Sequence, residues 1–219
     1  MAQAAGGSRG NLPVPPDPLH RSASADERLR RWLQDVLDTP GLTAIADREA
    51  AWAMLAEDAL RGAEVVADFE GAIVDVGSGG GSPGIPLAVA LPDREVTLLE
   101  ANARKARFLE QAASGFPNVK VLRGRAEEQD PDRFGVAVAK ALASPPVALE
   151  WCLPLVRPGG AAVLWVGPVT DFGLLSRVAE QLAGGRPEER AGLAVVPKIG
   201  PTPPGFPRRV GVARKRPLA

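Results

Sequence analysis

The sequence has few of the side chains that enzymes use most often for nucleophilic and acid–base catalysis. Its 219 residues include one cysteine, one histidine and no tyrosine. A single cysteine, Cys152, excludes an intramolecular disulfide and a cysteine-rich zinc site, and we expect no bound metal. The single histidine, His20, lies in a proline-rich stretch, which argues against Ser-His-Asp and Cys-His catalysis.

The sequence also lacks long hydrophobic runs and net charge. No apolar segment reaches the roughly 18 residues that cross a bilayer, and the N-terminus lacks the apolar core of a secretory signal. We therefore expect a cytoplasmic protein without a membrane partner. Residues 31–98 carry 4 basic and 12 acidic residues, whereas residues 186–219 carry 8 basic and 2 acidic residues. A basic C-terminal region on a neutral chain indicates a phosphate-bearing partner.

Changes in composition divide the chain into three parts. Residues 1–23 are rich in glycine, proline, alanine and serine, which predicts a disordered leader. Residues 24–70 are predicted to form a small helical cap, whose first helix begins with a capping box from Ser24 to Glu27. A second cap helix is predicted over residues 47–61. Residues 71–219 are predicted to form the main domain, which ends in a basic C-terminal strand or tail.

The main domain alternates short apolar runs with helical patterns. This alternation is typical of βαβ units and predicts an α/β fold whose parallel sheet is covered on both faces. A last strand pair is predicted at residues 193–197 and 209–213. The four tryptophans, Trp151 among them, lie in apolar patterns and are predicted to be core residues. The expected strands occupy residues 72–76, 96–99, 119–122, 136–139 and 161–166, and the expected helices occupy residues 103–113, 145–155 and 172–182.

A glycine-rich loop follows the first of these strands. From Asp75 to Gly81 the sequence reads Asp-Val-Gly-Ser-Gly-Gly-Gly, and a helical pattern comes next. Glycines at such a turn let the backbone approach a ligand closely. Glu100 stands at the end of the next strand, 25 residues after Asp75. A carboxylate at that position can accept both hydrogen bonds of a ribose diol.

Two adenosine-containing cofactors fit this loop. Residues 79–84 satisfy the Gly-x-Gly-x-x-Gly pattern, so a dinucleotide-dependent oxidoreductase is one alternative. Asp75 favours S-adenosylmethionine instead, because a carboxylate suits the cationic amino acid of that cofactor and would repel a pyrophosphate. A nucleotide-binding P-loop is excluded, since no Gly-Lys-Ser or Gly-Lys-Thr follows the glycines.

Residues 75–88, DVGSGGGSPGIPLA, resemble the signature of the ribosomal small-subunit methyltransferase G family, also called glucose-inhibited division protein B. The resemblance implies a Rossmann-like, S-adenosylmethionine-dependent methyltransferase with a mainly parallel seven-stranded sheet flanked by helices. It also implies methyl transfer to guanine N7 of 16S rRNA, in the small ribosomal subunit or its precursor, by a protein that we expect to be a monomer. The similarity recurs at residues 96–100, 104–109, 125–128, 149–160, 206–211 and 215–218.

The resemblance and the loop together define candidate site residues. The family's cofactor contacts fall on Gly77, Ser82, Ala126, Glu127 and Lys140, and Lys140 is also expected to lie near the methyl donor or the target base. The complete predicted cofactor site is Asp75, Gly77, Ser78, Gly79, Gly81, Ser82, Glu100, Ala126, Glu127 and Lys140. The predicted RNA-binding residues form a basic cluster without acids, Arg208, Arg209, Arg214, Lys215 and Arg216.

The chemistry implied by the resemblance needs no catalytic base. Guanine N7 carries an in-plane lone pair, so the enzyme only has to align N7, the methyl group and the sulfur. Leu55, Lys140 and Val166 depart from the family pattern. These departures favour a further alternative, a non-catalytic or differently targeted paralogue that keeps the cofactor fold and binds RNA or protein.

Overall fold

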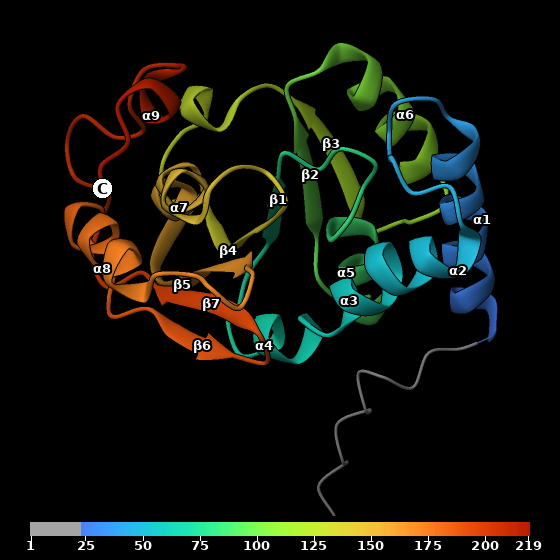
Figure 1. The fold of residues 1–219 in the computed structure, drawn as a ribbon, viewed down its shortest axis with the longest axis horizontal. Helices are drawn as coiled ribbons and strands as arrows, with labels where there is room; N and C mark the ends of the chain where they lie inside the picture. Colours follow the sequence, from blue (N-terminus) through green and yellow to red (C-terminus); the bar gives the residue numbers. More distant parts are fainter. Residues whose placement is uncertain (1–22) are drawn as a thin grey trace, which may run out of the picture.

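Seven strands form one mixed sheet in this computed structural model, which describes residues 23–219 (Figure 1). The strand order is β3-β2-β1-β4-β5-β7-β6, with β1 to β5 parallel and β7 antiparallel to both β5 and β6. The prediction of a mainly parallel, seven-stranded sheet is confirmed. The strands are β1 (Ile73–Val76), β2 (Val96–Glu100), β3 (Val119–Arg123), β4 (Phe134–Lys140), β5 (Val156–Trp165), β6 (Glu188–Arg190) and β7 (Leu193–Pro197).

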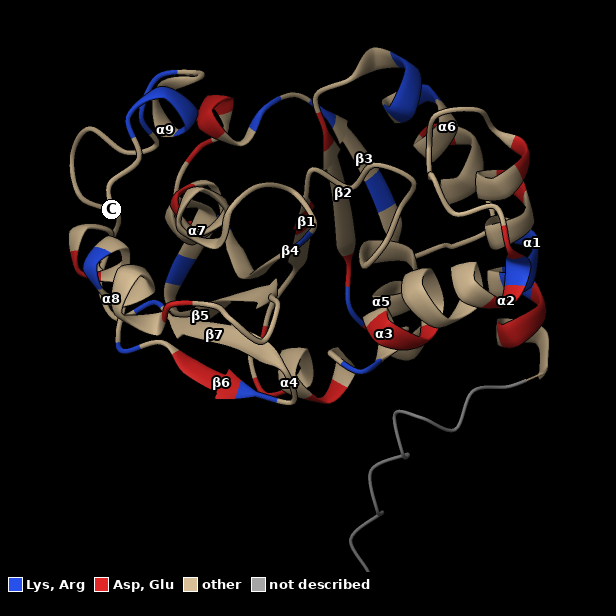
Figure 2. Ribbon diagram, in the orientation of Figure 1, with Lys and Arg blue, Asp and Glu red and all other residues tan. Residues whose placement is uncertain are grey.

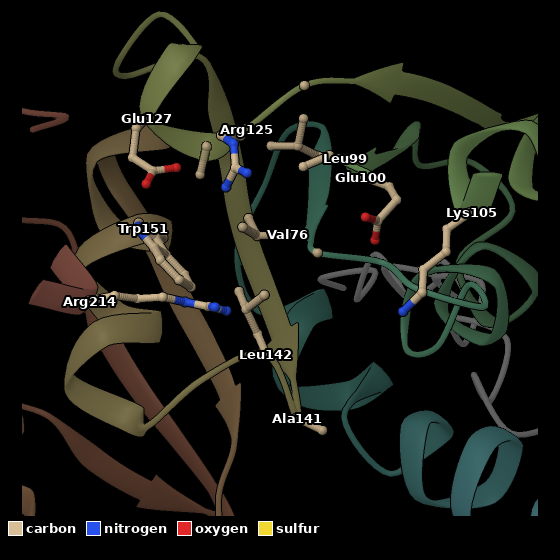
Figure 3. Close-up of a pocket in the computed structure, with 14 residues that line it drawn as sticks. Val76, Leu99, Glu100, Lys105, Arg125, Glu127, Ala141, Leu142, Trp151 and Arg214 are labelled. Carbon is tan, nitrogen blue, oxygen red and sulfur yellow. The ribbon is translucent and has the colours of Figure 1, made fainter. Parts of the chain in front are cut away.

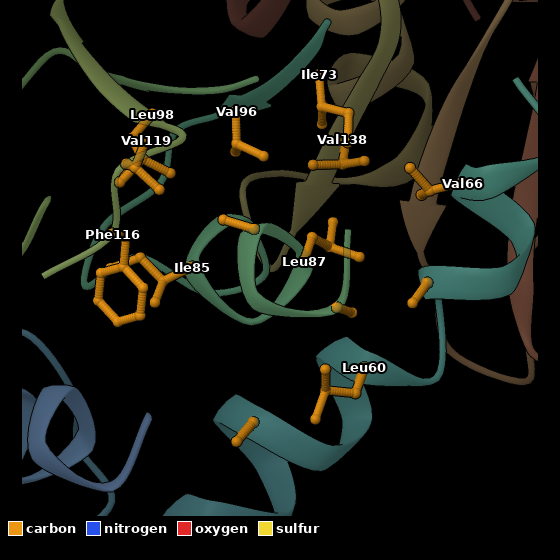
Figure 4. Close-up of a cluster of buried hydrophobic side chains, with 14 of the residues drawn as sticks. Leu60, Val66, Ile73, Ile85, Leu87, Val96, Leu98, Phe116, Val119 and Val138 are labelled. Carbon is orange, nitrogen blue, oxygen red and sulfur yellow. The ribbon is translucent and has the colours of Figure 1, made fainter. Parts of the chain in front are cut away.

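Short apolar runs build the centre of the sheet. Every residue of β1 and β2 is buried, as expected for parallel strands covered on both faces. Alternate side chains of β1 enter different halves of the core, since Ile73 packs on the side of the N-terminal cap and Val74 on the opposite side. Figure 4 shows the first half, where Ile85 and Leu87 of helix α5 (Gly84–Ala90) pack beneath the strands.

Helices cover both faces of the sheet. The cap, α5 and α6 pack on one face, and α7 and α8 pack on the other (Figure 1). The predicted helices over 103–113, 145–155 and 172–182 are confirmed, and the second of them ends as a 3-10 turn, η3. No helix within residues 23–219 is both long and apolar enough to cross a membrane. The remaining elements of this region are α6 (Ala103–Ala113), η2 (Ala126–Glu128), α7 (Pro145–Cys152), η3 (Leu153–Leu155), α8 (Phe172–Gln181) and α9 (Val212–Lys215).

The N-terminal cap starts at α1 (Ala23–Asp38). The predicted leader over residues 1–23 lies outside the described residues, except for Ala23. Because α1 already includes Ser24, the predicted helix start at this serine is one residue late. The predicted helix over residues 47–61 is confirmed, and the Asp47 side chain caps it by accepting from the Ala50 N–H at 2.8 Å. This helical segment consists of α2 (Arg48–Ala51), a wider π-helical turn η1 (Trp52–Glu57) and α3 (Asp58–Leu60), and α4 (Ala63–Ala67) follows.

The predicted strand at residues 209–213 is wrong. β7 pairs with β5 on one side and on the other with β6, which comes just before β7 across the turn at Ala191 and Gly192. These two residues have φ values of 52° and 72°, the conformation that closes a tight hairpin. Residues 212–215 form α9 instead, directly after Gly211 with a φ of 79°. The basic C-terminal region is therefore a loop and a short helix that packs against α7.

Candidate cofactor site at the carboxyl edge of the sheet

A pocket of about 290 Å³ opens at the carboxyl ends of β1, β2 and β4 (Figure 3). The strand order reverses between β1 and β4, and open α/β sheets bind their ligands at such a reversal. Four of the ten predicted cofactor residues line this pocket, Gly77, Glu100, Ala126 and Glu127. The fold thus brings together residues that are up to 50 positions apart in the sequence.

The glycine loop between β1 and α5 turns through the left-handed region of backbone conformation. Gly77, Gly79 and Gly81 have φ values of 73°, 58° and 102°, which other residues adopt only with strain. A Cβ at Gly77 would lie 2.3 Å from Cδ1 of Leu142 across the pocket. The Gly77 N–H donates to the Leu99 carbonyl at 2.8 Å, so the loop closes over the end of β2 with its backbone at the pocket.

Glu100 accepts hydrogen bonds from the backbone and also lines the pocket. Its Oε2 accepts from the Gly79 N–H at 2.9 Å, and its Oε1 accepts from the Asn102 N–H at 2.7 Å. An ionised carboxylate offers about four acceptor positions, so about two remain for a ligand. Glu100 is buried yet lines the pocket. The carboxylate is therefore held in one orientation by the loop and can accept from the two hydroxyls of a ribose.

Asp75 lies in β1 as predicted, but its side chain is not part of the pocket wall. It is 1% exposed and does not line the pocket. Its Oδ2 accepts from the Gly84 N–H at 3.0 Å, and its Oδ1 has no hydrogen-bond partner among the described residues. Burial raises the pKa of Asp75 to about 7. Asp75 therefore supports the start of α5, and its contact with the cofactor's amino acid group stays a prediction.

The outer side of the glycine loop packs against the cap. The Trp32 indole N–H donates to the Gly80 carbonyl at 2.8 Å, and the Ser82 hydroxyl donates to the Leu55 carbonyl at 2.8 Å. Ser78 instead locks the turn internally, because its hydroxyl donates to the Asp75 carbonyl at 2.8 Å. The predicted cofactor residues that do not line the pocket are Asp75, Ser78, Gly79, Gly81, Ser82 and Lys140.

Lys140 is directed toward the cap. Its Nζ lies 2.6 Å from Oδ2 of Asp58 and also donates to the Met54 carbonyl. The side chain is 15% exposed, and the backbone carbonyl of Asp58 accepts from the Trp165 indole N–H at 2.8 Å. The end of β4 is therefore tied to the η1–α3 junction of the cap. Sequence reasoning identified Lys140 but not the partner carboxylate, which lies 82 residues earlier.

Several pocket residues were not among the predicted cofactor residues. Trp151 of α7 is predicted to be a core residue; it is buried, but it also lines the pocket. The Arg214 guanidinium lies 5.2 Å from the centroid of this indole ring. Leu142, Lys105 and Arg125 line the pocket as well. Arg214 was predicted as an RNA contact, and only the packing of α9 on α7 shows that it reaches the cofactor pocket.

The basic C-terminal cluster is not free of acids, contrary to the sequence prediction. Arg208 Nε lies 2.5 Å from Glu150 Oε1, and its terminal nitrogen lies 2.6 Å from Oε2 of the same carboxylate. The Glu150 side chain is 2% exposed, so this two-point ion pair is nearly buried. Arg208 therefore fastens the C-terminal segment to α7. The other predicted RNA-binding residues, Arg209, Arg214, Lys215 and Arg216, are exposed.

The pocket fits S-adenosylmethionine. Glu100 can take the ribose diol, the Gly77 backbone lies close where a side chain would clash with Leu142, and apolar side chains form the walls. At the first turn of η2, the N–H groups of Ala126 and Glu127 have no partner within the turn, and they can face a heteroaromatic edge. Fold and pocket together define a Rossmann-like, S-adenosylmethionine-dependent methyltransferase.

Solved structures show the same fold. A TehB-like S-adenosylmethionine-dependent methyltransferase from Corynebacterium glutamicum superposes with a TM-score of 0.52 at 20% identity, covering 80% of this chain and 98% of that one. Human N-acetylserotonin methyltransferase in complex with S-adenosylmethionine has a TM-score of 0.55 at 12% identity, covering 80% of this chain and 56% of the human chain.

Sequence comparison identifies the family. The model of GidB, described as rRNA small subunit methyltransferase G, matches residues 26–171. Ribosomal RNA small subunit methyltransferase G of Acetivibrio thermocellus is 32% identical over 87% of this chain and 84% of its own length. The protein of the same name from Roseiflexus castenholzii is 33% identical over 91% of this chain and 92% of its own length. The chain belongs to the rRNA small subunit methyltransferase G family, which decides against the dinucleotide-dependent oxidoreductase.

Proposed function

We propose that this methyltransferase modifies guanine N7 of 16S rRNA, within the small ribosomal subunit or its precursor. The observation that carries the proposal is a methyl-donor pocket with cationic residues at its mouth, in a chain whose relatives are named for small-subunit rRNA. A polyanionic substrate suits such a mouth. We expect the protein to be located in the cytoplasm and to act as a monomer.

The side chains of the pocket suit a nucleophile that needs no deprotonation. Among the described residues the pocket wall contains no histidine, cysteine or tyrosine, and the carboxylate of Glu100 is held by two backbone N–H groups. The cofactor supplies an electrophilic methyl group. Guanine N7 presents its lone pair without loss of a proton, so alignment and exclusion of water are the tasks left to the protein.

The chain's own residues can perform these tasks. Glu100 orients the ribose, and the first turn of η2 at Ala126 and Glu127 borders the adenine. Val76 and Leu142 form apolar walls that keep water away from the bound cofactor. We assign Lys140 a positioning role, because its contact with Asp58 holds the cap against the end of β4.

Transfer of radiolabelled methyl groups to small subunits that lack N7 methylation tests this proposal. We expect label in 16S rRNA, mapped to one guanine N7. We expect Glu100→Gln to weaken cofactor binding at least about tenfold, since hydrogen bonds to a charged group contribute about 1.5–3 kcal/mol. Glu110→Gln, at an exposed position on α6, is the matched control and should behave as the wild type.

Three results would contradict the proposal. Cofactor binding measured by calorimetry without any label in RNA would favour the non-catalytic paralogue. Label at another atom or in another RNA would show a differently targeted enzyme. Absence of cofactor binding would contradict the pocket assignment itself.

A further inference from the structure

Three cationic side chains surround the mouth of the cofactor pocket. Lys105 comes from α6, Arg125 from the residue before η2, and Arg214 from α9. Figure 3 shows their charged ends directed toward the centre of the pocket from different sides. Within residues 23–219 no ion pair engages any of the three. We call Lys105, Arg125 and Arg214 the cationic rim.

The carboxylates of the pocket do not neutralise the rim by contact. Glu100 accepts from two backbone N–H groups, and Glu127 accepts from the Gly211 N–H at 3.2 Å. Glu128, which lies outside the pocket wall, accepts from the backbone N–H of Arg125 at 3.0 Å and not from its guanidinium. Within residues 23–219 the rim therefore keeps three positive charges without an ion-pair partner, in a pocket whose wall also contains Glu100 and Glu127.

The structure holds Arg214 of the rim in place. Arg214 lies over the Trp151 ring, and α9 is fastened nearby by the Arg208–Glu150 ion pair and by the Glu127–Gly211 hydrogen bond. An arginine held against an indole loses less conformational freedom on binding than an arginine in an unsupported tail. The fold therefore fixes the position of Arg214 at the pocket.

Further cations flank the rim and form a wider basic band, which the acidic residues of η2 interrupt. Figure 2 shows blue segments on α9, on the stretch between β3 and η2, and on α6, with red η2 next to α9, while β6 and α3 on the other edge also carry acidic residues. A chain of phosphates that follows this band would cross the mouth of the pocket. The exposed cations that extend the band beyond the rim are Arg107, Arg123, Arg209, Lys215 and Arg216.

We propose that the cationic rim binds the phosphate backbone of the RNA substrate directly over the occupied cofactor pocket. RNA then covers the cofactor, so the cofactor must enter before the RNA and leave after it. This inference rests on the proposed function, because it requires an RNA substrate. It adds a defined contact surface and an order of binding, which the methyl-transfer activity alone does not require.

Release of radiolabelled S-adenosylhomocysteine, chased with the unlabelled compound, tests the inference. Release is followed from the free protein and from protein bound to small subunits that lack N7 methylation, with the bound fraction isolated by sedimentation. We expect subunits to slow release from the wild type by at least about fivefold, the lower end of usual coupling between sites. The Arg125→Gln/Arg214→Gln variant should release at the same rate with and without subunits.

A matched double variant separates local contact from loss of total charge. Arg177→Gln/Arg186→Gln removes two exposed arginines from α8 and the loop after it, and should behave as the wild type. The salt dependence gives a second readout, since each lost contact to single-stranded RNA lowers the slope of log K against log salt by about 0.7. We expect a reduction of about 1.4 for the rim variant and none for the control.

Three outcomes would overturn the inference. In the first, subunits leave the release rate of S-adenosylhomocysteine from the wild type unchanged while label still enters RNA. In the second, the rim variant keeps both the slower release on subunits and the wild-type slope of log K against log salt. Weaker binding of S-adenosylhomocysteine to the free rim variant, without any change in subunit binding, would assign the rim to the cofactor. If the wild type neither binds nor labels subunits, the proposed function itself fails, and the parallel labelling assay shows the difference.

Discussion

Replacing Arg208 should destabilise the protein far more than replacing its neighbour Arg209. Arg208 makes a two-point ion pair with Glu150, whose side chain is 2% exposed, whereas Arg209 is exposed. Removing one partner of a nearly buried pair costs about 3–5 kcal/mol, because the other charge stays buried without compensation. Surface substitutions usually stay within about 0.5 kcal/mol. A domain of this size loses about 2–4 °C in Tm per kcal/mol, so Arg208→Ala should lower Tm by roughly 6–20 °C.

A second variant provides an internal check on the buried charge. Arg208→Ala combined with Glu150→Gln removes the uncompensated charge and should recover most of the lost stability.

Thermal unfolding of Arg208→Ala, Arg209→Ala and the double variant measures these differences. Equal and small changes for the two single variants would refute the structural role of the ion pair. If the double variant does not recover the lost Tm, then lost packing, and not a buried unpaired charge, causes the destabilisation.

Further predictions concern the loop and the cap. The pKa of Asp75 is raised to about 7 by burial, so the stability of the wild type should fall as the pH rises from 4 to 7, and urea unfolding of Asp75→Asn should lack this dependence. Gly77→Ala should weaken cofactor binding in calorimetry, because its Cβ would lie 2.3 Å from Cδ1 of Leu142 and would displace that side chain in the pocket wall, whereas Gly159→Ala, with a φ of 85° and open space around the added Cβ, should only lose about 1–2 kcal/mol of stability. Asp58→Asn should free Lys140 and slow methyl transfer about tenfold, or about 1.4 kcal/mol, while calorimetry shows cofactor affinity within twofold; an equal loss of both would contradict the positioning role.

Much of the fold was predictable because its signals are local. Apolar runs of strand length, helical spacing and the glycine loop each depend on residues close together in the chain. The switch from β1 to α5 through Gly77 could be assigned without coordinates, since only glycine adopts such turns readily. Glu100 could be placed as well, because parallel strands end at the same edge of the sheet.

What sequence reasoning missed has a common form. The strand at residues 209–213 was predicted from local composition, yet β7 pairs with β6 because the Ala191–Gly192 turn closes a hairpin first. Asp75 stands at the expected strand end, but its hydrogen bond to the Gly84 N–H at the start of α5 was not predicted. In both cases a neighbouring element makes the contact, and a pattern within one segment does not indicate it.

The sequence by itself determined the class of fold, the cofactor loop and the family, since each rests on short-range patterns and motifs. Only the tertiary structure decided which cations bind a partner and which hold the fold. Arg208 and Arg214 look alike in the basic cluster, but one meets Glu150 and the other reaches the cofactor pocket beside Trp151. Their roles depend on residues about 60 positions away, and packing of α9 on α7 brings them within contact distance.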